Sequence, residues 1–129
     1  TMGTSMIQQM VLVGFGGAIG AILRFTVGNY IETSEFPLST FIVNIVGSFL
    51  LGMLAVLSIN YGYSEEIMLF FATGLLGAFT TMSTFSLETI TLLKDDNFST
   101  AIMYAGLSFL MCIIFSFVGW AAGERISFS

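Results

Sequence analysis

The stretch Gly74–Glu88 reads GLLGAFTTMSTFSLE and lies within a long apolar segment. Glycine, serine and β-branched threonine are concentrated here, where a membrane-spanning helix favours leucine. We predict that this helix is broken. A break exposes backbone carbonyls, which at membrane depth are tolerated only against protein, a cavity or an ion. Gly77–Ser83 is therefore the best candidate for an ion site, and Phe85 beside it has an electropositive ring edge that can face an anion.

The composition of the whole chain is that of an integral membrane protein. Of the 129 residues, 56% are hydrophobic and 9% are charged, and the mean hydropathy is +0.96. A soluble domain carries about a quarter charged residues. The chain has no histidine and one cysteine, so we expect no zinc or haem cluster, no catalytic triad and no enzyme activity. The net charge of −5 argues against nucleic acid as a partner, because nucleic acid demands a basic patch.

The charged residues, three positive and eight negative, fall mostly between four apolar segments. Each uncharged run is about 20 residues or longer, the length of helix that crosses roughly 30 Å of hydrocarbon. We predict an all-α, multi-pass protein of the cell membrane, with one four-helix domain over residues 1–129. The expected helices are 7–31, 38–60, 65–93 and 98–124.

The basic residues bear on orientation in the membrane. The first apolar run has no basic n-region and continues through Arg24, so we expect a retained span and not a cleaved signal peptide. Four spans put both termini and the loop at 61–66 on one side. Lys and Arg near helix ends direct insertion, but Arg125 lies on that side and Lys94 on the other. Charge alone leaves one fixed orientation and an antiparallel, dual-topology dimer both open.

Polar side chains with four-residue spacing form a stripe on each of two predicted helices. The stripes are Thr40, Asn44 and Ser48 on the second helix and Tyr104, Ser108, Cys112 and Ser116 on the fourth. Intramembrane polar groups are costly and mark functional sites by default. Asn44 is either an interhelical hydrogen-bond partner or a pore-lining donor. Because the chain has so few polar residues, two such stripes suggest that the two helices line a shared hydrated path.

The first predicted helix carries small residues and one charge on the same face. Gly16 and Gly20 form a small-xxx-small pair, which lets another helix approach closely. Arg24 continues the four-residue spacing, and its guanidinium has to snorkel to a vestibule, pair with a carboxylate or face an anion. Glu88 could hold either Arg24 or a network of hydroxyl groups.

Three motifs in order resemble those of the Fluc (CrcB) family of fluoride channels. The motifs are Gly16–Gly20 with Arg24, Ser39–Asn44 with Gly47–Phe49, and Gly77–Ser86 with Glu88. The resemblance covers the whole chain. It implies a fluoride-selective channel that exports cytoplasmic fluoride by passive electrodiffusion. It also implies an antiparallel dual-topology homodimer, or a pair of homologous subunits, with two pores and a central structural sodium ion.

The same resemblance implies the site residues. The sodium ligands are the backbone carbonyls of Gly77 and Thr80 from each subunit. A selective pore replaces the hydration of fluoride with donors and ring edges; the implied fluoride pathway comprises Thr40, Asn44, Met82, Ser83, Thr84, Phe85, Tyr104 and Ser108, with Arg24 in the vestibule. Two positions depart from the family pattern. Met82 stands where phenylalanine is usual, and Cys112 stands where a hydroxyl is common.

Two other classes of protein remain as alternatives. A small multidrug transporter also has four spans and dual topology, but it needs a membrane-embedded carboxylate in the first helix, where this chain has Arg24. A non-conducting membrane assembly subunit would explain the glycine faces. It would not explain Asn44, the threonine-rich stretch and Phe85 together.

Overall fold

The computed structural model describes residues 5–31 and 34–128, and within these ranges the fold is helical with no strand. Four helical segments are long and apolar enough to cross a membrane, and their ends lie close to the predicted ones. They are Met6–Tyr30, Leu38–Tyr61, Glu65–Lys94 and Phe98–Ser127. The predicted all-α organisation with four spans is confirmed.

Three of the spans are single helices, and the third is composite. The single helices are α1 (Met6–Tyr30), α2 (Leu38–Tyr61) and α6 (Phe98–Ser127). The third span consists of α3 (Glu65–Met68), the π-helical η1 (Leu69–Leu76), α4 (Gly77–Phe79) and α5 (Met82–Lys94). Between α4 and α5, Thr80 and Thr81 have extended backbone, with ψ of 154° and 119°.

Polar caps and one glycine set the helix ends. At the start of α1, the Ser5 hydroxyl accepts from the Gln8 N–H at 3.2 Å and the Gln8 side chain accepts from the Ser5 N–H at 2.9 Å, which is a capping box. Gly62 ends α2 in the left-handed conformation, with φ of 66°. The Thr81 hydroxyl accepts from the Thr84 N–H at 3.2 Å and so begins α5.

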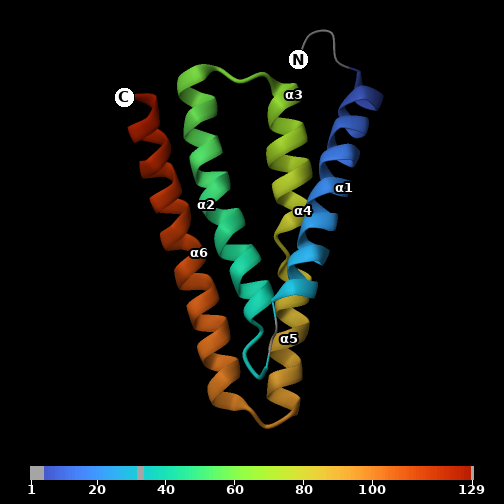
Figure 1. The fold of residues 1–129 in the computed structure, drawn as a ribbon, viewed down its shortest axis with the longest axis vertical. Helices are drawn as coiled ribbons and strands as arrows, with labels where there is room; N and C mark the ends of the chain where they lie inside the picture. The colour runs from blue at the N-terminus through green and yellow to red at the C-terminus, as the bar shows by residue number, and fades with distance from the viewer. Residues whose placement is uncertain (1–4, 32–33, 129) are drawn as a thin grey trace.

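The spans are arranged as two arms that splay apart toward one end (Figure 1). In one arm α2 packs against α6, and in the other α1 packs against η1 and α4. The start of α1, the end of α6 and the turn between α2 and α3 lie at the open end of the arms. Helix α1 runs down to about the level at which α4 gives way to α5, and the turn between α5 and α6 lies at the opposite end of the bundle. This placement is the one that the four-span prediction requires.

Glycines bring the backbones of the α1 arm into direct contact. A Cβ atom added at Gly16 would overlap the carbonyl of Phe70, and one added at Gly20 would overlap the carbonyl of Leu75. Close approach of this kind is what small residues provide between membrane helices, where there is no hydrophobic driving force for association. The packing role predicted for the two glycines is confirmed.

The α2 arm is joined in the same way by glycines that the sequence analysis did not single out. A Cβ atom at Gly52 would overlap the carbonyl of Ser116, and one at Gly119 would overlap the carbonyl of Phe49. The Ser116 hydroxyl also donates to the carbonyl of Ser48 at 3.3 Å. Each arm is therefore a pair of helices in backbone contact.

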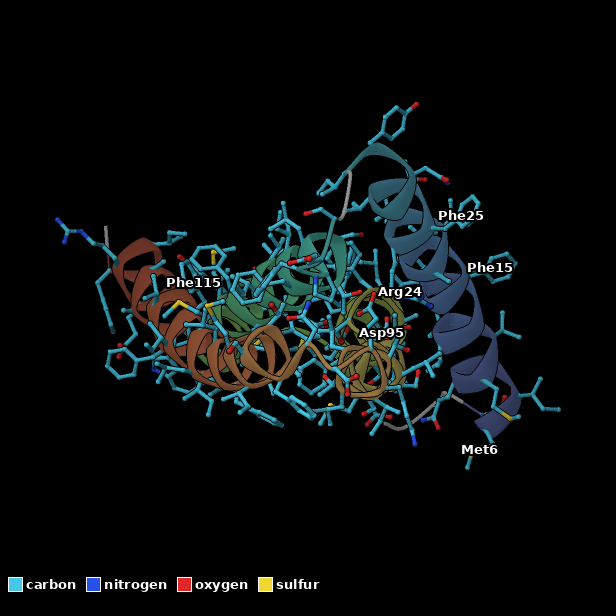
Figure 2. The ribbon with its side chains drawn as sticks, turned by 90° about the horizontal axis from the view of Figure 1, so that it is seen from below. Met6, Phe15, Arg24, Phe25, Asp95 and Phe115 are labelled. Carbon is cyan, nitrogen blue, oxygen red and sulfur yellow. The ribbon has the colours of Figure 1, made fainter. Side chains whose placement is uncertain are left out.

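The outer surface of the bundle is apolar. Large side chains such as Phe15, Phe25 and Phe117 are exposed along the helices. Figure 2 shows Phe15 and Phe25 pointing away from the bundle, with Arg24 on the inner side of α1. A soluble monomer rarely exposes so much contiguous apolar surface. Lipid is the solvent that suits this surface.

Candidate functional site

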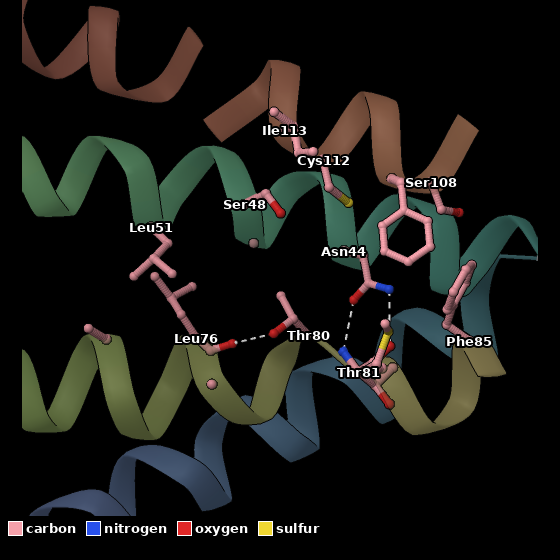
Figure 3. A pocket seen from close by; sticks show the side chains of 15 residues that line it. Asn44, Ser48, Leu51, Leu76, Thr80, Thr81, Phe85, Ser108, Cys112 and Ile113 are labelled. Atoms are coloured by element: carbon pink, nitrogen blue, oxygen red, sulfur yellow. Dashed lines mark hydrogen bonds between the residues drawn. The ribbon is translucent and has the colours of Figure 1, made fainter. Parts of the chain in front are cut away.

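A cavity of about 300 Å³ lies between α2, the third span and α6 (Figure 3). Its lining residues are Asn44, Gly47, Ser48 and Leu51 of α2, Ala72, Leu76, Gly77, Thr80, Thr81, Met82 and Phe85 of the third span, and Ser108, Phe109, Cys112 and Ile113 of α6. None of these fifteen described residues is charged. The cavity is thus an apolar space with a few hydroxyl, amide and sulfur groups, which is the usual makeup of a site for a small ligand.

The amide of Asn44 binds the backbone at the interruption of the third span. Its Nδ2 donates to the carbonyl of Thr81 at 3.1 Å, and its Oδ1 accepts from the N–H of Thr81 at 2.8 Å. Figure 3 shows the two bonds side by side. Of the two roles expected for Asn44, the interhelical hydrogen bond is therefore present, and the amide lines the cavity as well.

Two backbone N–H groups near the interruption donate to side chains instead of to the carbonyls four residues earlier. The Thr81 N–H donates to Asn44, whereas a continuous helix would direct it to the carbonyl of Gly77. The Thr84 N–H donates to the hydroxyl of Thr81, whereas helical geometry would direct it to the carbonyl of Thr80. The carbonyls of Gly77 and Thr80 are thereby released from the helical hydrogen-bond pattern.

Arg24 of α1 binds the end of α4. Its Nε donates to the carbonyl of Ala78 at 3.1 Å, and its side chain is half-buried. The last carbonyls of a helix have no intrahelical donor and carry the negative end of the helix dipole, so a guanidinium suits this position. Arg24 thus has a backbone partner; contact with an anion stays a prediction.

Aromatic rings close the cavity on the α5 side. Phe85 is buried, and its ring lies 5.1 Å from that of Tyr104 and 5.6 Å from that of Phe109, measured between centroids. Phe109 meets Phe85 edge to face, at an interplanar angle of 88°. The sequence gives no signal for Phe109, because a phenylalanine in an apolar helix is ordinary there.

Tyr104 and Glu88 form a polar pair next to these rings. The Tyr104 hydroxyl donates to Glu88 at 2.9 Å, and Tyr104 is fully buried. Glu88 was expected to bind either Arg24 or hydroxyl groups, and in the structure it accepts from a hydroxyl. Thr40 is buried too.

Ser108 differs from several other hydroxyls on the helices. Thr26, Ser86 and Thr89 each donate to the carbonyl four residues earlier, at 2.8 to 2.9 Å. Ser108 is only 6% exposed, yet its hydroxyl has no hydrogen-bond partner in the part of the chain that the structure describes. A buried hydroxyl left without a partner costs about 1–3 kcal/mol.

The cavity brings together about half of the residues predicted for the site. Those in its lining are Asn44, Gly77, Thr80, Met82, Phe85 and Ser108. Those outside its lining are Arg24, Thr40, Ser83, Thr84 and Tyr104. Ser83 and Thr84 are linked to the cavity through Thr81, which lines it. Their hydroxyls lie 3.4 and 3.1 Å from the hydroxyl of Thr81. Gly47 was not predicted as a site residue; a Cβ atom there would overlap the Thr80 side chain.

The apolar exterior and the four spans define a polytopic α-helical membrane protein, and the uncharged cavity between the spans is its candidate site for a small solute. Residues 11–120 match the family described as CrcB-like protein, Camphor Resistance (CrcB). The chain belongs to this family, as its motifs indicated, and it is a multi-pass protein of the cell membrane.

Individual relatives are similar over most of their length. The chain is 41% identical over 118 residues to the fluoride-specific ion channel FluC 2 of Bacillus thuringiensis subsp. konkukian, covering 89% of this chain and 97% of that protein. It is 39% identical over 123 residues to a fluoride-specific ion channel FluC of Thermus thermophilus, covering 93% and 97%. It is 44% identical over 110 residues to the fluoride-specific ion channel FluC 1 of Methanosarcina acetivorans, covering 83% and 81%.

Proposed function

We propose that this chain is a subunit of a fluoride channel, through which cytoplasmic fluoride leaves the cell passively. Three relatives of similar length are named fluoride-specific ion channels. The observation that carries the proposal on the structural side is the unpartnered hydroxyl of Ser108 in a cavity lined by uncharged residues. A small, strongly hydrated anion can replace part of its water with such donors, and no fixed charge in the lining would trap it.

The pathway that we propose follows the cavity between α2, α5 and α6. The amide of Asn44 has two N–H bonds; one donates to Thr81, and we assign the other to fluoride. Phe85 contributes a positive ring edge and Ser108 a hydroxyl. We place the remaining predicted residues along the approaches, with Met82 at the cavity wall; they are Arg24, Thr40, Ser83, Thr84 and Tyr104.

We further propose an antiparallel dimer of dual topology with two pores, formed with a second copy or a homologous subunit. The even division of Arg125 and Lys94 between the two ends of the bundle supports this arrangement, since it gives insertion no preferred direction. The exposed apolar helix faces support it as well, because they leave room for a partner in the membrane.

The proposed dimer would hold a structural sodium ion. Hard cations take oxygen ligands, and the carbonyls of Gly77 and Thr80 fit this need because Asn44 and the Thr81 hydroxyl have diverted their helical donors. Two subunits would supply four such carbonyls. The bound ion would contribute a fixed positive charge near the path of an anion.

Reconstitution in liposomes tests the function. We expect purified protein to release fluoride down its gradient and to exclude chloride strongly, measured with ion-selective electrodes after a potassium ionophore is added. Protein-free liposomes are the control for leak. Equal fluoride and chloride efflux would refute the proposal and return the assembly-subunit and transporter alternatives to consideration.

A further inference from the structure

Helix α2 contacts the interruption of the third span at two points on one face. Asn44 binds the backbone of Thr81, accepting from its N–H at 2.8 Å and donating to its carbonyl at 3.1 Å. Gly47 lies three residues further along the same face, and a Cβ atom there would overlap the Cγ2 methyl of Thr80. Both contacts lie in the cavity lining. One face of α2 therefore holds two consecutive residues of the interruption.

The Thr80 side chain is fixed where it meets Gly47. Its Oγ1 donates to the carbonyl of Leu76 at 3.1 Å (Figure 3), while its methyl group occupies the space that a side chain at Gly47 would need. Of the three staggered rotamers of threonine, only the one that turns the Cβ hydrogen toward Gly47 makes room there. That rotamer replaces the hydroxyl at Leu76 with the methyl, and a carbon needs about 3.3–3.6 Å from a carbonyl oxygen. With a side chain at Gly47, the Thr80 backbone has to shift in every rotamer.

The orientation of the Thr80 carbonyl follows from the same two contacts. In a trans peptide the C=O and N–H groups point in opposite directions. Because Asn44 binds the Thr81 N–H, the carbonyl of the peptide between Thr80 and Thr81 is directed away from Asn44 and from α2. Gly47 sets how closely Thr80, with its extended ψ of 154°, approaches α2. A shift of the Thr80 backbone at Gly47 therefore displaces the Thr80 carbonyl.

We propose that Gly47 is a positioning residue for the structural cation: by leaving room for the Thr80 side chain, it holds the Thr80 carbonyl where a sodium ion can bind it. The inference rests on the sodium ion of the proposed function. Gly47 contributes no ligand of its own, since it acts through Thr80. Binding by backbone carbonyls depends on their number and placement, so displacement of one carbonyl weakens the binding of sodium.

The test compares variants of the full chain, purified in potassium buffers, as sodium chloride is added at constant ionic strength. One readout is the sodium concentration that gives half-maximal fluoride efflux from liposomes. The other is the sodium concentration at which the unfolding midpoint in mixed micelles begins to rise. It requires no transport, because a ligand that binds only the folded state stabilises that state. We expect Gly47→Ala to raise both concentrations about 10–100-fold, the usual cost of losing a group that orients a metal ligand.

A second substitution tests whether the effect passes through Thr80. Thr80→Ser keeps Oγ1 and removes Cγ2, which leaves Phe79 Cδ2 and Thr80 Cβ as the atoms nearest to a Cβ at Gly47, at the ordinary contact distances of 3.4 and 3.7 Å. Gly47→Ala combined with Thr80→Ser should therefore show the sodium requirement of Thr80→Ser alone. Gly52→Ala is the control for a merely structural effect. It makes the same change on α2, against the carbonyl of Ser116, and should lower stability with the sodium requirement of the parent.

The outcomes separate this inference from the function on which it rests. The role of Gly47 is overturned if Gly47→Ala keeps the sodium requirement of the parent, if Gly52→Ala shifts it equally, or if the double variant fails to fold or to recover. If Gly47→Ala alone does not fold, a folded double variant with the sodium requirement of Thr80→Ser supports the steric reasoning. A parent protein that conducts fluoride but responds to sodium in neither readout refutes the sodium ion and with it the role of Gly47. A parent without fluoride efflux refutes the proposed channel, while the micelle readout still decides the role of Gly47.

Discussion

The amide of Asn44 is the contact on which the interruption of the third span depends, and its removal gives the sharpest test of the structure. Asn44→Leu keeps the side-chain size but removes both hydrogen bonds to Thr81, at 3.1 and 2.8 Å. Hydrogen bonds between membrane helices contribute about 0.6–2 kcal/mol each. We therefore expect the variant to lose about 1–4 kcal/mol of unfolding free energy, because two such bonds are lost.

The expected loss of function is larger than the loss of stability. Without Asn44 the Thr81 N–H can return to the carbonyl of Gly77, which extends α4 and removes that carbonyl from the cavity. Asn44→Asp tests the donor alone: it retains an acceptor for the Thr81 N–H but places a second oxygen against the Thr81 carbonyl. It also places a negative charge in the span, which costs about 2.5–3.5 kcal/mol on insertion scales. We expect both variants to lose fluoride efflux.

Asn29 supplies the matched control. Its amide donates to the carbonyl of Phe25 at 3.2 Å, near the exposed end of α1 and away from the cavity. Asn29→Leu and Asn29→Asp should keep efflux near that of the parent. Unfolding in mixed micelles measures stability, and electrode traces from liposomes measure efflux. If Asn44→Leu is as stable as Asn29→Leu, the hydrogen-bond reasoning is refuted; if Asn44→Asp conducts normally, the assignment of Asn44 to the pathway is wrong.

Three further outcomes are expected. Phe85→Ile should impair fluoride efflux more than Met82→Ile, since only Phe85 presents a ring edge; the reverse order would contradict a role for ring edges. Gly20→Ala should lose about 1–3 kcal/mol by overpacking against the Leu75 carbonyl, whereas Gly14→Ala, in open space inside α1, should lose no stability and gain up to about 1 kcal/mol of helix propensity. Crosslinking of engineered cysteine pairs in membranes should trap antiparallel subunits, and exclusively parallel products would overturn the dual-topology proposal.

The limits of the spans could be predicted from the sequence because charge and hydropathy act locally. Lys94 and the acidic residues after it end the third span where expected, and Gly62 ends the second. The packing of Gly16 and Gly20 was also predictable, since small residues at four-residue spacing have one common use in a membrane.

What could not be predicted depends on how one helix is rotated against another. Asn44 was expected to donate either to another helix or into a pore. The structure shows that its amide does two things at once: it binds the Thr81 backbone and it lines the cavity. The sequence likewise gives no reason for a π-helical η1 or for a ring at Phe109 beside Phe85. Tyr104 and Glu88 lie on different helices, and their pairing follows from the same long-range geometry.

The contact between Arg24 and Ala78 has a consequence for how the protein is made. The partner of the guanidinium lies 54 residues further along the chain, so it has not yet been synthesised when α1 leaves the ribosome. During that interval the guanidinium has to stay at the membrane surface, bound to water or lipid headgroups, because the hydrocarbon core offers it no acceptor. The first span therefore reaches its final depth only after the third has been inserted, and a nascent chain cut before Ala78 should leave α1 poorly anchored.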